Sequence, residues 1–168
     1  RGLGDVYKRQ SWDNNIFFNL LEEHKIAYCN IDQPIFPHSL APTALVTRKE
    51  FSYVRLHGRN RQNWFRKSAG RDERYDYLYS RDELSEWVDR IRNLGKKSDK
   101  VFVITNNHYQ GQALTNAIQI KNMISGEKMD IPLSLVEKYP ALNEIIRRIK
   151  EGQLDLFRER PGRSKDTD

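Results

Sequence analysis

The hydrophobic positions of this chain change their spacing from segment to segment, and the spacing predicts helices that alternate with strands. Apolar residues recur every three to four positions over residues 12–24, which predicts a helix with Ser11 as its N-cap. The same period predicts helices over residues 84–94, behind a capping box at 80–83, and over residues 113–124.

Three shorter apolar runs predict strands at residues 27–31, 53–56 and 101–105. Long segments without periodicity, predicted to be loops, follow the first and second strands. A last helix is predicted from Pro140, and the residues of its apolar face are Leu142, Ile145, Ile146 and Ile149. Strands that alternate with helices favour a parallel sheet, and the strands are too few to close a barrel.

Alternation within each strand predicts which side chains share a face of the sheet. One face is predicted to be polar, and the opposite face is predicted to be apolar and to lie against covering helices. The polar set is Tyr28, Asn30, Asp32, Tyr53, Arg55 and His57; the apolar set is Ala27, Cys29, Ile31, Val54 and Leu56. In the third strand one shared face, made of Val101, Val103, Thr105 and Asn107, becomes polar toward the C-terminal end. Such a pattern is typical of a barrel lumen that opens into a site at the C-terminal ends of its strands.

Composition narrows the class of protein. The chain has 168 residues, enough for one domain, and a net charge of +6 that favours anionic partners. Residues 1–10 lack periodicity and are interpreted as a non-native scar; without them the charge is +4, because three basic residues and one acidic residue leave. The single cysteine, Cys29, is interpreted as a buried hydrophobic residue and fits a reducing cytoplasm. No apolar run long enough for a membrane span is present, so no membrane partner is predicted.

Two side chains at the end of the second strand are the first candidates for chemistry. A buried Arg55 must be paired, and its partner could be Asp32, an acid elsewhere in the protein, or an anionic ligand. His57 could be a general acid or base, a metal ligand, or a hydrogen-bonded structural residue.

The loops add further candidates. Asn106, Asn107 and His108 offer donors for a phosphate, a sugar hydroxyl or an oxyanion, or they form an ordinary hydrogen-bonded turn. The loop after the second strand interleaves cations with aromatic residues, and its candidates for ligand contact are Arg59, Trp64, Tyr75 and Tyr77. Cations neutralise phosphates and aromatic rings stack on bases or sugars, although such rings could instead dock on the barrel rim.

The motifs together resemble a known family. They are the segment YVRLHGR at 53–59, the tyrosines at 75, 77 and 79 that lead into Glu83-Leu84 and Trp87, and the segment from Asn106-Asn107 through Gly111 to Asn116-Ala117. Over residues 11–150 the chain resembles the C-terminal part of the domain-of-unknown-function 72 family. The resemblance implies a TIM-like barrel of about 250 residues, of which this chain would hold about the last three strands.

The resemblance also implies a domain organisation and a place for the site. Residues 11–157 are predicted to be the C-terminal part of one barrel domain, and residues 158–168 a disordered charged tail. The missing N-terminal half of the same protein is a predicted partner. In TIM barrels the loops after the last two strands often form a phosphate site. In this chain those loops follow Leu56 and Thr105.

The leading hypothesis is a cytoplasmic enzyme that acts on a phosphate-bearing substrate, by hydrolysis of a nucleotide or nucleic acid. Arg55 and Arg59 would hold the anion, and His57 would be the acid or base. Asp32 would orient a partner or help to bind a divalent metal, although the sequence indicates no particular cofactor. The alternatives are a non-catalytic nucleic-acid-binding module and a sugar isomerase or epimerase. This chain alone is predicted to be inactive, because an incomplete barrel leaves strand edges unpaired.

Overall fold

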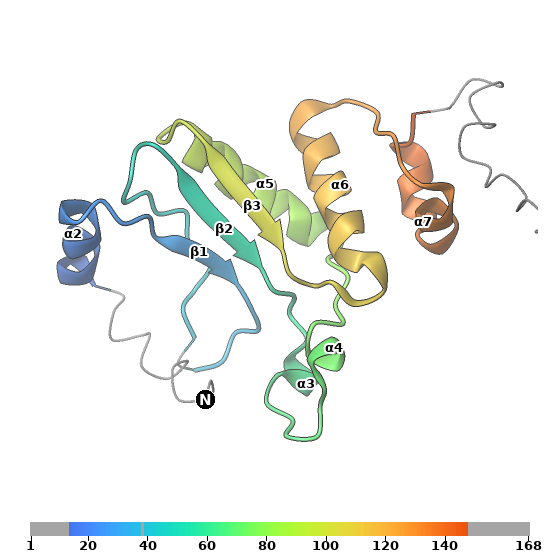
Figure 1. Ribbon diagram of the computed structural model, residues 1–168, viewed down its shortest axis with the longest axis horizontal. Coiled ribbons are helices and arrows are strands. Elements are labelled where there is room, and N and C mark those ends of the chain that lie inside the picture. Colours follow the sequence, from blue (N-terminus) through green and yellow to red (C-terminus); the bar gives the residue numbers. More distant parts are fainter. Residues whose placement is uncertain (1–13, 38, 148–168) are drawn as a thin grey trace, which may run out of the picture.

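A three-stranded parallel sheet organises the molecule (Figure 1). The structure is a computed structural model that describes residues 14–37 and 39–147. The strands are β1 (Cys29–Asp32), β2 (Ser52–Leu56) and β3 (Val101–Thr105), and they lie in the order β1-β2-β3 with both pairs parallel. The predicted α/β class and the three strands are confirmed, and β1 begins two residues later than predicted.

The longer helices begin and end at the capping signals of the sequence. Helix α5 (Arg81–Gly95) has the complete capping box between Ser80 and Glu83 that was predicted. Helix α6 (Gln112–Ser125) ends at Gly126, whose φ of 72° is left-handed. Helix α2 (Asn15–Glu23) has Asn14 as its N-cap, so the predicted Ser11 cap is wrong for this helix; Ser11 itself lies outside the described residues.

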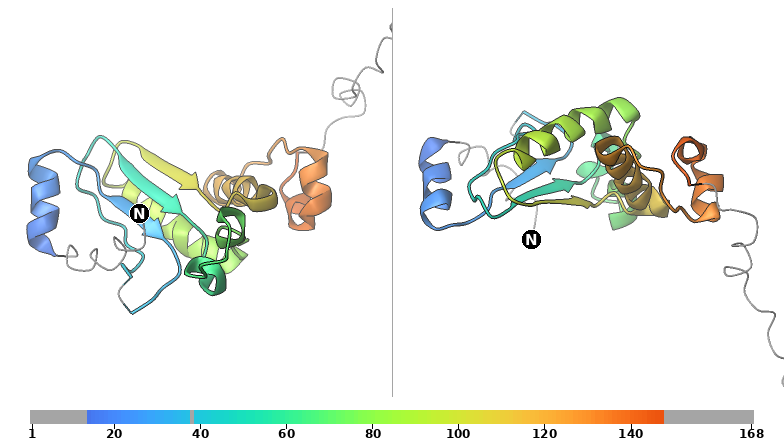
Figure 2. Two further views of the ribbon diagram at one scale, coloured as in Figure 1. Left: turned by 60° about the horizontal axis from the view of Figure 1, so that its bottom comes forward. Right: turned by 90° about the horizontal axis from the view of Figure 1, so that it is seen from above.

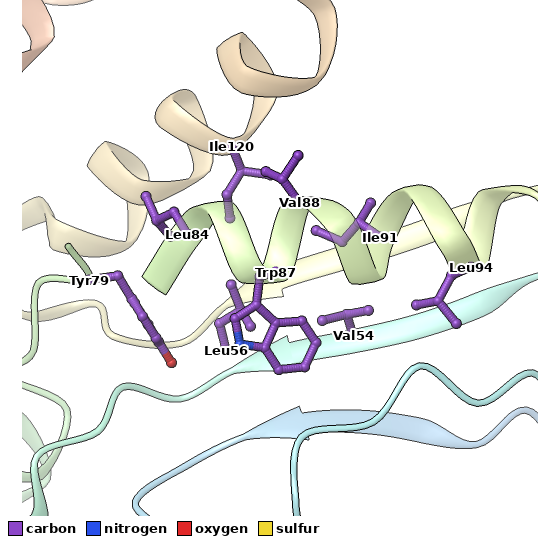
Figure 3. Packing of buried hydrophobic residues seen from close by; sticks show 9 residues of the cluster. All are labelled: Val54, Leu56, Tyr79, Leu84, Trp87, Val88, Ile91, Leu94 and Ile120. Atoms are coloured by element: carbon purple, nitrogen blue, oxygen red, sulfur yellow. The ribbon is translucent and has the colours of Figure 1, made fainter. Parts of the chain in front are cut away.

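Helix α5 covers one face of the sheet, as the right-hand view of Figure 2 shows. Its buried side chains pack on Val54 and Leu56 of β2, with Ile120 of α6 beside them (Figure 3). The α5 residues in this core are Leu84, Trp87, Val88, Ile91 and Leu94, as the helical spacing predicted. Burying side chains of this size contributes about 1.5–3 kcal/mol each to folding. No described helix lies over the opposite face of the sheet.

The register of the strands corrects the predicted faces. Neighbouring partners in a parallel sheet share a face, and Asn30 pairs with Val54 while Asp32 pairs with Leu56. Asn30 and Asp32 therefore lie on the face covered by α5, whereas Cys29 and Ile31 share the uncovered face with Arg55. In β3, Val101, Val103 and Thr105 do share a face, as predicted, but it is the covered face and not the side of a lumen; Phe102 and Ile104 lie on the uncovered one.

Asn30 shows why a polar residue can lie on the covered face. Its side-chain amide donates to the carbonyl of Leu45 at 3.0 Å, and its oxygen accepts from the Leu45 N–H at 2.8 Å and from the Thr43 hydroxyl at 3.0 Å. The loop that follows β1 and the Tyr53 carbonyl of β2, 3.4 Å from the Asn30 amide nitrogen, thus satisfy the buried amide together. Polarity alone did not reveal which face of this strand is exposed.

The segment after α6 differs from the prediction. Instead of one helix from Pro140 there is α7 (Leu133–Lys138), followed by the 3₁₀ helix η3 (Pro140–Glu144). The chain then extends, because residues 145–147 bond to Met129: the Met129 N–H donates to Ile145 at 2.8 Å, and the Arg147 N–H donates to Met129 at 2.7 Å. The predicted face residue Ile149 lies outside the described residues.

Three short elements complete the described chain. The predicted long loop between β2 and α5 contains α3 (Arg61–Trp64) and α4 (Arg71–Arg74), and the 3₁₀ helix η2 (Tyr109–Gly111) joins β3 to α6. No described helix has both the length and the apolar character needed to cross a membrane.

Candidate functional site

A pocket of about 500 Å³ lies on the uncovered face of the sheet, near the C-terminal ends of β1 and β2. Strand residues form its floor, and the loop between β2 and α5 contributes Trp64 and Tyr75. The lining residues are Phe17, Tyr28, Cys29, Ile31, Gln33, Leu40, Arg55, His57, Trp64 and Tyr75. Of the predicted site residues, Arg55, His57, Trp64 and Tyr75 therefore meet at one place.

Arg55 is the cation of this pocket. Its Nε donates to the side-chain oxygen of Asn106 at 3.1 Å. Within residues 14–37 and 39–147 no carboxylate lies within ion-pair distance of Arg55, and its two Nη groups donate to no protein acceptor. A guanidinium stays charged at any physiological pH and its two Nη groups can contact two oxygens of one anion. The pocket thus has a cationic donor pair for which the described part of the chain provides no carboxylate partner.

The rings around His57 form the wall of the pocket. The His57 centroid lies 6.3 Å from that of Trp64 and 6.0 Å from that of Tyr75. Tyr75 in turn lies 5.4 Å from the ring of His108. His57 begins the turn after β2, and its backbone N–H donates to the Asp32 carbonyl at 3.0 Å. An imidazole in an aromatic wall next to a cation can exchange a proton with a bound ligand.

His108 lies at the rim rather than in the pocket. Its Nδ1 is 2.9 Å from the Asn106 carbonyl, and its Nε2 is 3.4 Å from the Asp72 carboxylate. These contacts join the loop after β3 to helix α4. His108 packs on the ring of Tyr75, which lines the pocket, but does not line the pocket itself.

Asp32 does not pair with Arg55, and the predicted Asp32–Arg55 brace is wrong. The Asp32 carboxylate is fully buried on the opposite face of the sheet, where Arg59 Nη2 lies 2.9 Å from it. Tyr79 also donates its hydroxyl to this carboxylate, at 2.5 Å. Burial and the negative charge of Asp32 raise the pKa of Tyr79 well above its usual range. Burial is the largest single influence and would lower the pKa of Arg59, but the hydrogen bonds to Asp32 and the attraction to the charges of Asp32 and Glu83 together raise it.

Tyr77 belongs to the same covered region. Its hydroxyl donates to Glu83 at 2.6 Å, and Arg59 Nη1 lies 3.1 Å from the same carboxylate. Burial, together with the hydrogen bond to Glu83, raises the pKa of Tyr77 to about 12. Burial alone would raise the pKa of Glu83, but hydrogen bonds from the Tyr77 hydroxyl and the Ser80 N–H lower it overall. Arg59 and Tyr77 thus contact protein carboxylates, and neither lines the pocket.

Asn107 holds the loop that precedes α5 in place by hydrogen bonds. It is fully buried, and its amide donates to the Tyr77 carbonyl at 2.7 Å and to Asn116 at 2.8 Å. Asn116 accepts from the Tyr79 N–H at 3.1 Å. This role of Asn116 was not predicted, although an amide within the apolar stripe of a helix was a usable signal in the sequence.

Two further features concern reactivity. Cys29, which was interpreted as buried in the core, lies half-buried in the pocket lining. The register relative to Arg55, rather than the apolar neighbours, decides its face. In the part of the chain that the structure describes, no group of three or more His, Cys, Asp and Glu side chains is placed to hold a metal ion.

A parallel sheet whose strand ends carry a pocket of polar and aromatic side chains defines an α/β protein of the barrel type. The chain belongs to the family described as protein of unknown function DUF72, whose model matches residues 7–141. The resemblance seen in the sequence is thereby confirmed.

Curated and solved relatives agree with this assignment. The UPF0759 protein YunF of Bacillus subtilis is 28% identical over 138 residues, which are 74% of this chain and 49% of that protein. The crystal structure of a DUF72 family protein (TM1631) from Thermotoga maritima is 37% identical, with a TM-score of 0.63 over 68% of this chain and 42% of that one. A DUF72 family protein (ef0366) from Enterococcus faecalis is 25% identical, with a TM-score of 0.63 over 72% of this chain and 46% of that one. The chain therefore spans about half the length of these relatives.

Proposed function

We propose that this chain forms part of an enzyme that hydrolyses a phosphate-bearing substrate, either a nucleotide or a nucleic acid. The observation that carries the proposal is Arg55, a pocket cation whose partner among the described residues is a neutral amide. A charge in that state favours an anionic ligand, because a protein carboxylate would otherwise neutralise it.

Each pocket residue has a role in this proposal. Asn106 holds the Nε of Arg55, which leaves both Nη groups for two oxygens of a phosphate. Trp64 and Tyr75 offer ring faces and edges to a base or a sugar, and stacking on such rings contributes about 1–3 kcal/mol per base. His57 would give a proton to the leaving oxygen or take one from the attacking water.

The proposal concerns the whole family protein, since the chain spans about half of its relatives. Other residues of the intact protein would complete the site, and a divalent metal remains one group that they could hold. The single cysteine supports a cytoplasmic location for this activity.

A nucleic-acid-binding module without catalysis is the second candidate. The basic and aromatic segment of residues 59–67, which follows β2, favours it. Arg61 lies over the ring of Phe36 at 5.4 Å, and this ring packs on Phe65 at 4.6 Å. Exposed cations beside aromatic rings suit the backbone and bases of a single strand. Replacing Arg61, Arg66 and Lys67 by Ser should then flatten the salt dependence of oligonucleotide binding.

Cys29 provides the test of the pocket, because it is the only cysteine of the chain and lies in the pocket lining. Inorganic phosphate and a dinucleotide should each slow the reaction of Cys29 with iodoacetamide. Arg55→Lys keeps the charge but loses the paired donors, so protection should largely disappear. Arg81→Lys, at an exposed position on α5, is the matched control and should keep full protection.

The variant His57→Ala distinguishes the two candidate functions, the enzyme and the binding module. Slow hydrolysis of bis(p-nitrophenyl) phosphate by the complete family protein that disappears in this variant, with Cys29 protection retained, would support the enzyme. Protection by oligonucleotides without any turnover in the complete family protein would favour the binding module. A rate of Cys29 modification that does not change when phosphate is added to the unaltered chain would contradict the proposed role of Arg55 in anion binding.

A further inference from the structure

A hydrogen-bonded unit lies behind the pocket, on the covered face of the sheet. The buried Asp32 carboxylate accepts from Arg59 Nε at 2.9 and 3.1 Å, from Arg59 Nη2 at 2.9 Å and from the Tyr79 hydroxyl at 2.5 Å. The single Nε hydrogen is shared between both carboxylate oxygens, so three donor hydrogens surround a carboxylate that is fully buried. Asp32 therefore has nothing left to offer a ligand, and its role must be exerted on its protein neighbours.

The three residues that directly follow β2, residues 57–59, are each bonded to Asp32 or to Tyr79. The His57 N–H donates to the Asp32 carbonyl at 3.0 Å, and the Gly58 N–H donates to the Tyr79 hydroxyl oxygen at 2.8 Å. Arg59 is held through its side chain by the Asp32 carboxylate. The turn leaves little freedom, since Gly58 has a left-handed φ of 88° and a Cβ added there would lie 2.8 Å from the Cβ of Tyr77.

We propose that Asp32, Arg59 and Tyr79 are positioning residues for His57, which hold the backbone of residues 57–59 so that the imidazole stays in the pocket wall. The inference rests on the proposed function of the pocket, but it assigns roles to residues that do not touch a ligand. It also replaces the catalytic role predicted for Asp32.

The charges of the unit explain why the position of the His57 imidazole can be changed without changing the attraction of the pocket for an anion. Arg59 neutralises Asp32 on the covered face, so the charge of Arg55 on the uncovered face remains available to an anion. Removing the Tyr79 hydroxyl changes no charge at neutral pH. Tyr79→Phe therefore alters the position of His57 while it leaves the electrostatic attraction of the pocket intact.

The test follows the imidazole resonances of His57 by NMR in the 168-residue chain, with and without inorganic phosphate. His57→Ala assigns these signals among the four histidines. In Tyr79→Phe we expect the phosphate-induced shift of His57 to fall by more than half, while phosphate protection of Cys29 stays within a factor of about two of the unaltered chain. Tyr139→Phe is the matched control, because its hydroxyl donates to the Gln110 carbonyl at 2.9 Å, outside the unit.

Unchanged His57 signals in a Tyr79→Phe protein with a lowered melting temperature would overturn the proposal, since the unit would then only stabilise the fold. If Tyr79→Phe does not fold, Arg59→Lys takes its place: lysine keeps a charge beside Asp32 but lacks the paired donors, and the same loss of the His57 shift is expected.

Failure of the proposed function would look different. The unaltered chain would then show neither a phosphate-induced shift nor protection of Cys29. The positioning role is judged in that case from the His57 signals without phosphate. These must differ between the unaltered chain and Tyr79→Phe, and must agree between the unaltered chain and Tyr139→Phe; signals that agree in all three would overturn it.

Discussion

Two arginines four positions apart illustrate the difference between the faces of this sheet. Arg59 lies against the covered face, where Asp32 and Glu83 neutralise it at 2.9 and 3.1 Å. Arg55 lies on the uncovered face, where a neutral amide holds its Nε at 3.1 Å. The sequence gives both residues the same charge and similar neighbours, yet one completes a protein network and the other leaves donors available to a ligand. A cation is informative about binding only when its carboxylates are accounted for.

Stability should separate the two arginines most strongly. Arg59→Met removes the cation from a fully buried carboxylate, and breaking such a pair costs about 3–5 kcal/mol. Arg55→Met loses one hydrogen bond to an amide, and we expect a change of less than about 1 kcal/mol. Urea unfolding followed by circular dichroism measures both. Equal losses would remove the distinction between the two faces.

The turn between the two arginines should be the next most sensitive position. Gly58→Ala places a methyl 2.8 Å from the Cβ of Tyr77 in a left-handed conformation, and we expect a loss of about 3 kcal/mol. Gly126→Ala is also left-handed but meets no atom within 4 Å, so its loss should be about 1 kcal/mol. Thermal melts of both variants isolate the cost of the contact, and similar melting temperatures would contradict it.

Alkaline pH should lower the stability of the folded chain through Tyr77, which lies on the covered side of the sheet. The pKa of Tyr77 is raised to about 12 in the folded chain, whereas an unfolded tyrosine titrates near 10. Between these values the folded state binds more protons than the unfolded state, so stability is complete below pH 10 and falls as the pH rises toward 12. Urea midpoints at increasing pH measure this fall, which should be shallower in Tyr77→Phe. An identical slope in that variant would contradict the assignment.

The smallest effect is expected at the amide that holds Arg55. Asn106→Ala removes one partly buried hydrogen bond, and we expect a loss of less than about 1 kcal/mol together with a several-fold higher phosphate concentration for Cys29 protection. Asn122→Ala, whose amide donates to Glu127 at 2.8 Å on the surface, should lower stability no more and leave protection unchanged. Full protection in Asn106→Ala would mean that Arg55 binds phosphate without being oriented by the Asn106 side chain.

Local signals in the sequence predicted the elements of this fold well. The capping box at Ser80 and the stripe from Leu84 to Leu94 identify α5 because both depend on residues within a few positions of one another. The candidate site residues were separated less well, because Arg55, His57, Trp64 and Tyr75 line one pocket while the other six candidates do not.

The faces of the strands could not be predicted in the same way. Alternation shows that Asn30 and Asp32 share a face, but only the pairing of Asp32 with Leu56 shows that this face lies under α5. The bond from Arg59 to Asp32 joins residues 27 positions apart, and no local pattern distinguishes it from a bond between Arg55 and Asp32. Buried polar networks were therefore the main source of error.

The placement of two tryptophans gives the molecule a pair of intrinsic optical probes. Trp87 is fully buried in the core under α5, so its emission should be blue-shifted and should change only when the sheet and helix separate. Trp64 lies half-buried in the pocket wall, so its emission should respond to whatever fills the pocket. Because the chain has a third tryptophan, Trp12, replacing both Trp12 and Trp64 by Phe would leave Trp87 alone to report unfolding. The difference between the spectra with and without Trp64 would report occupancy of the pocket without any added label.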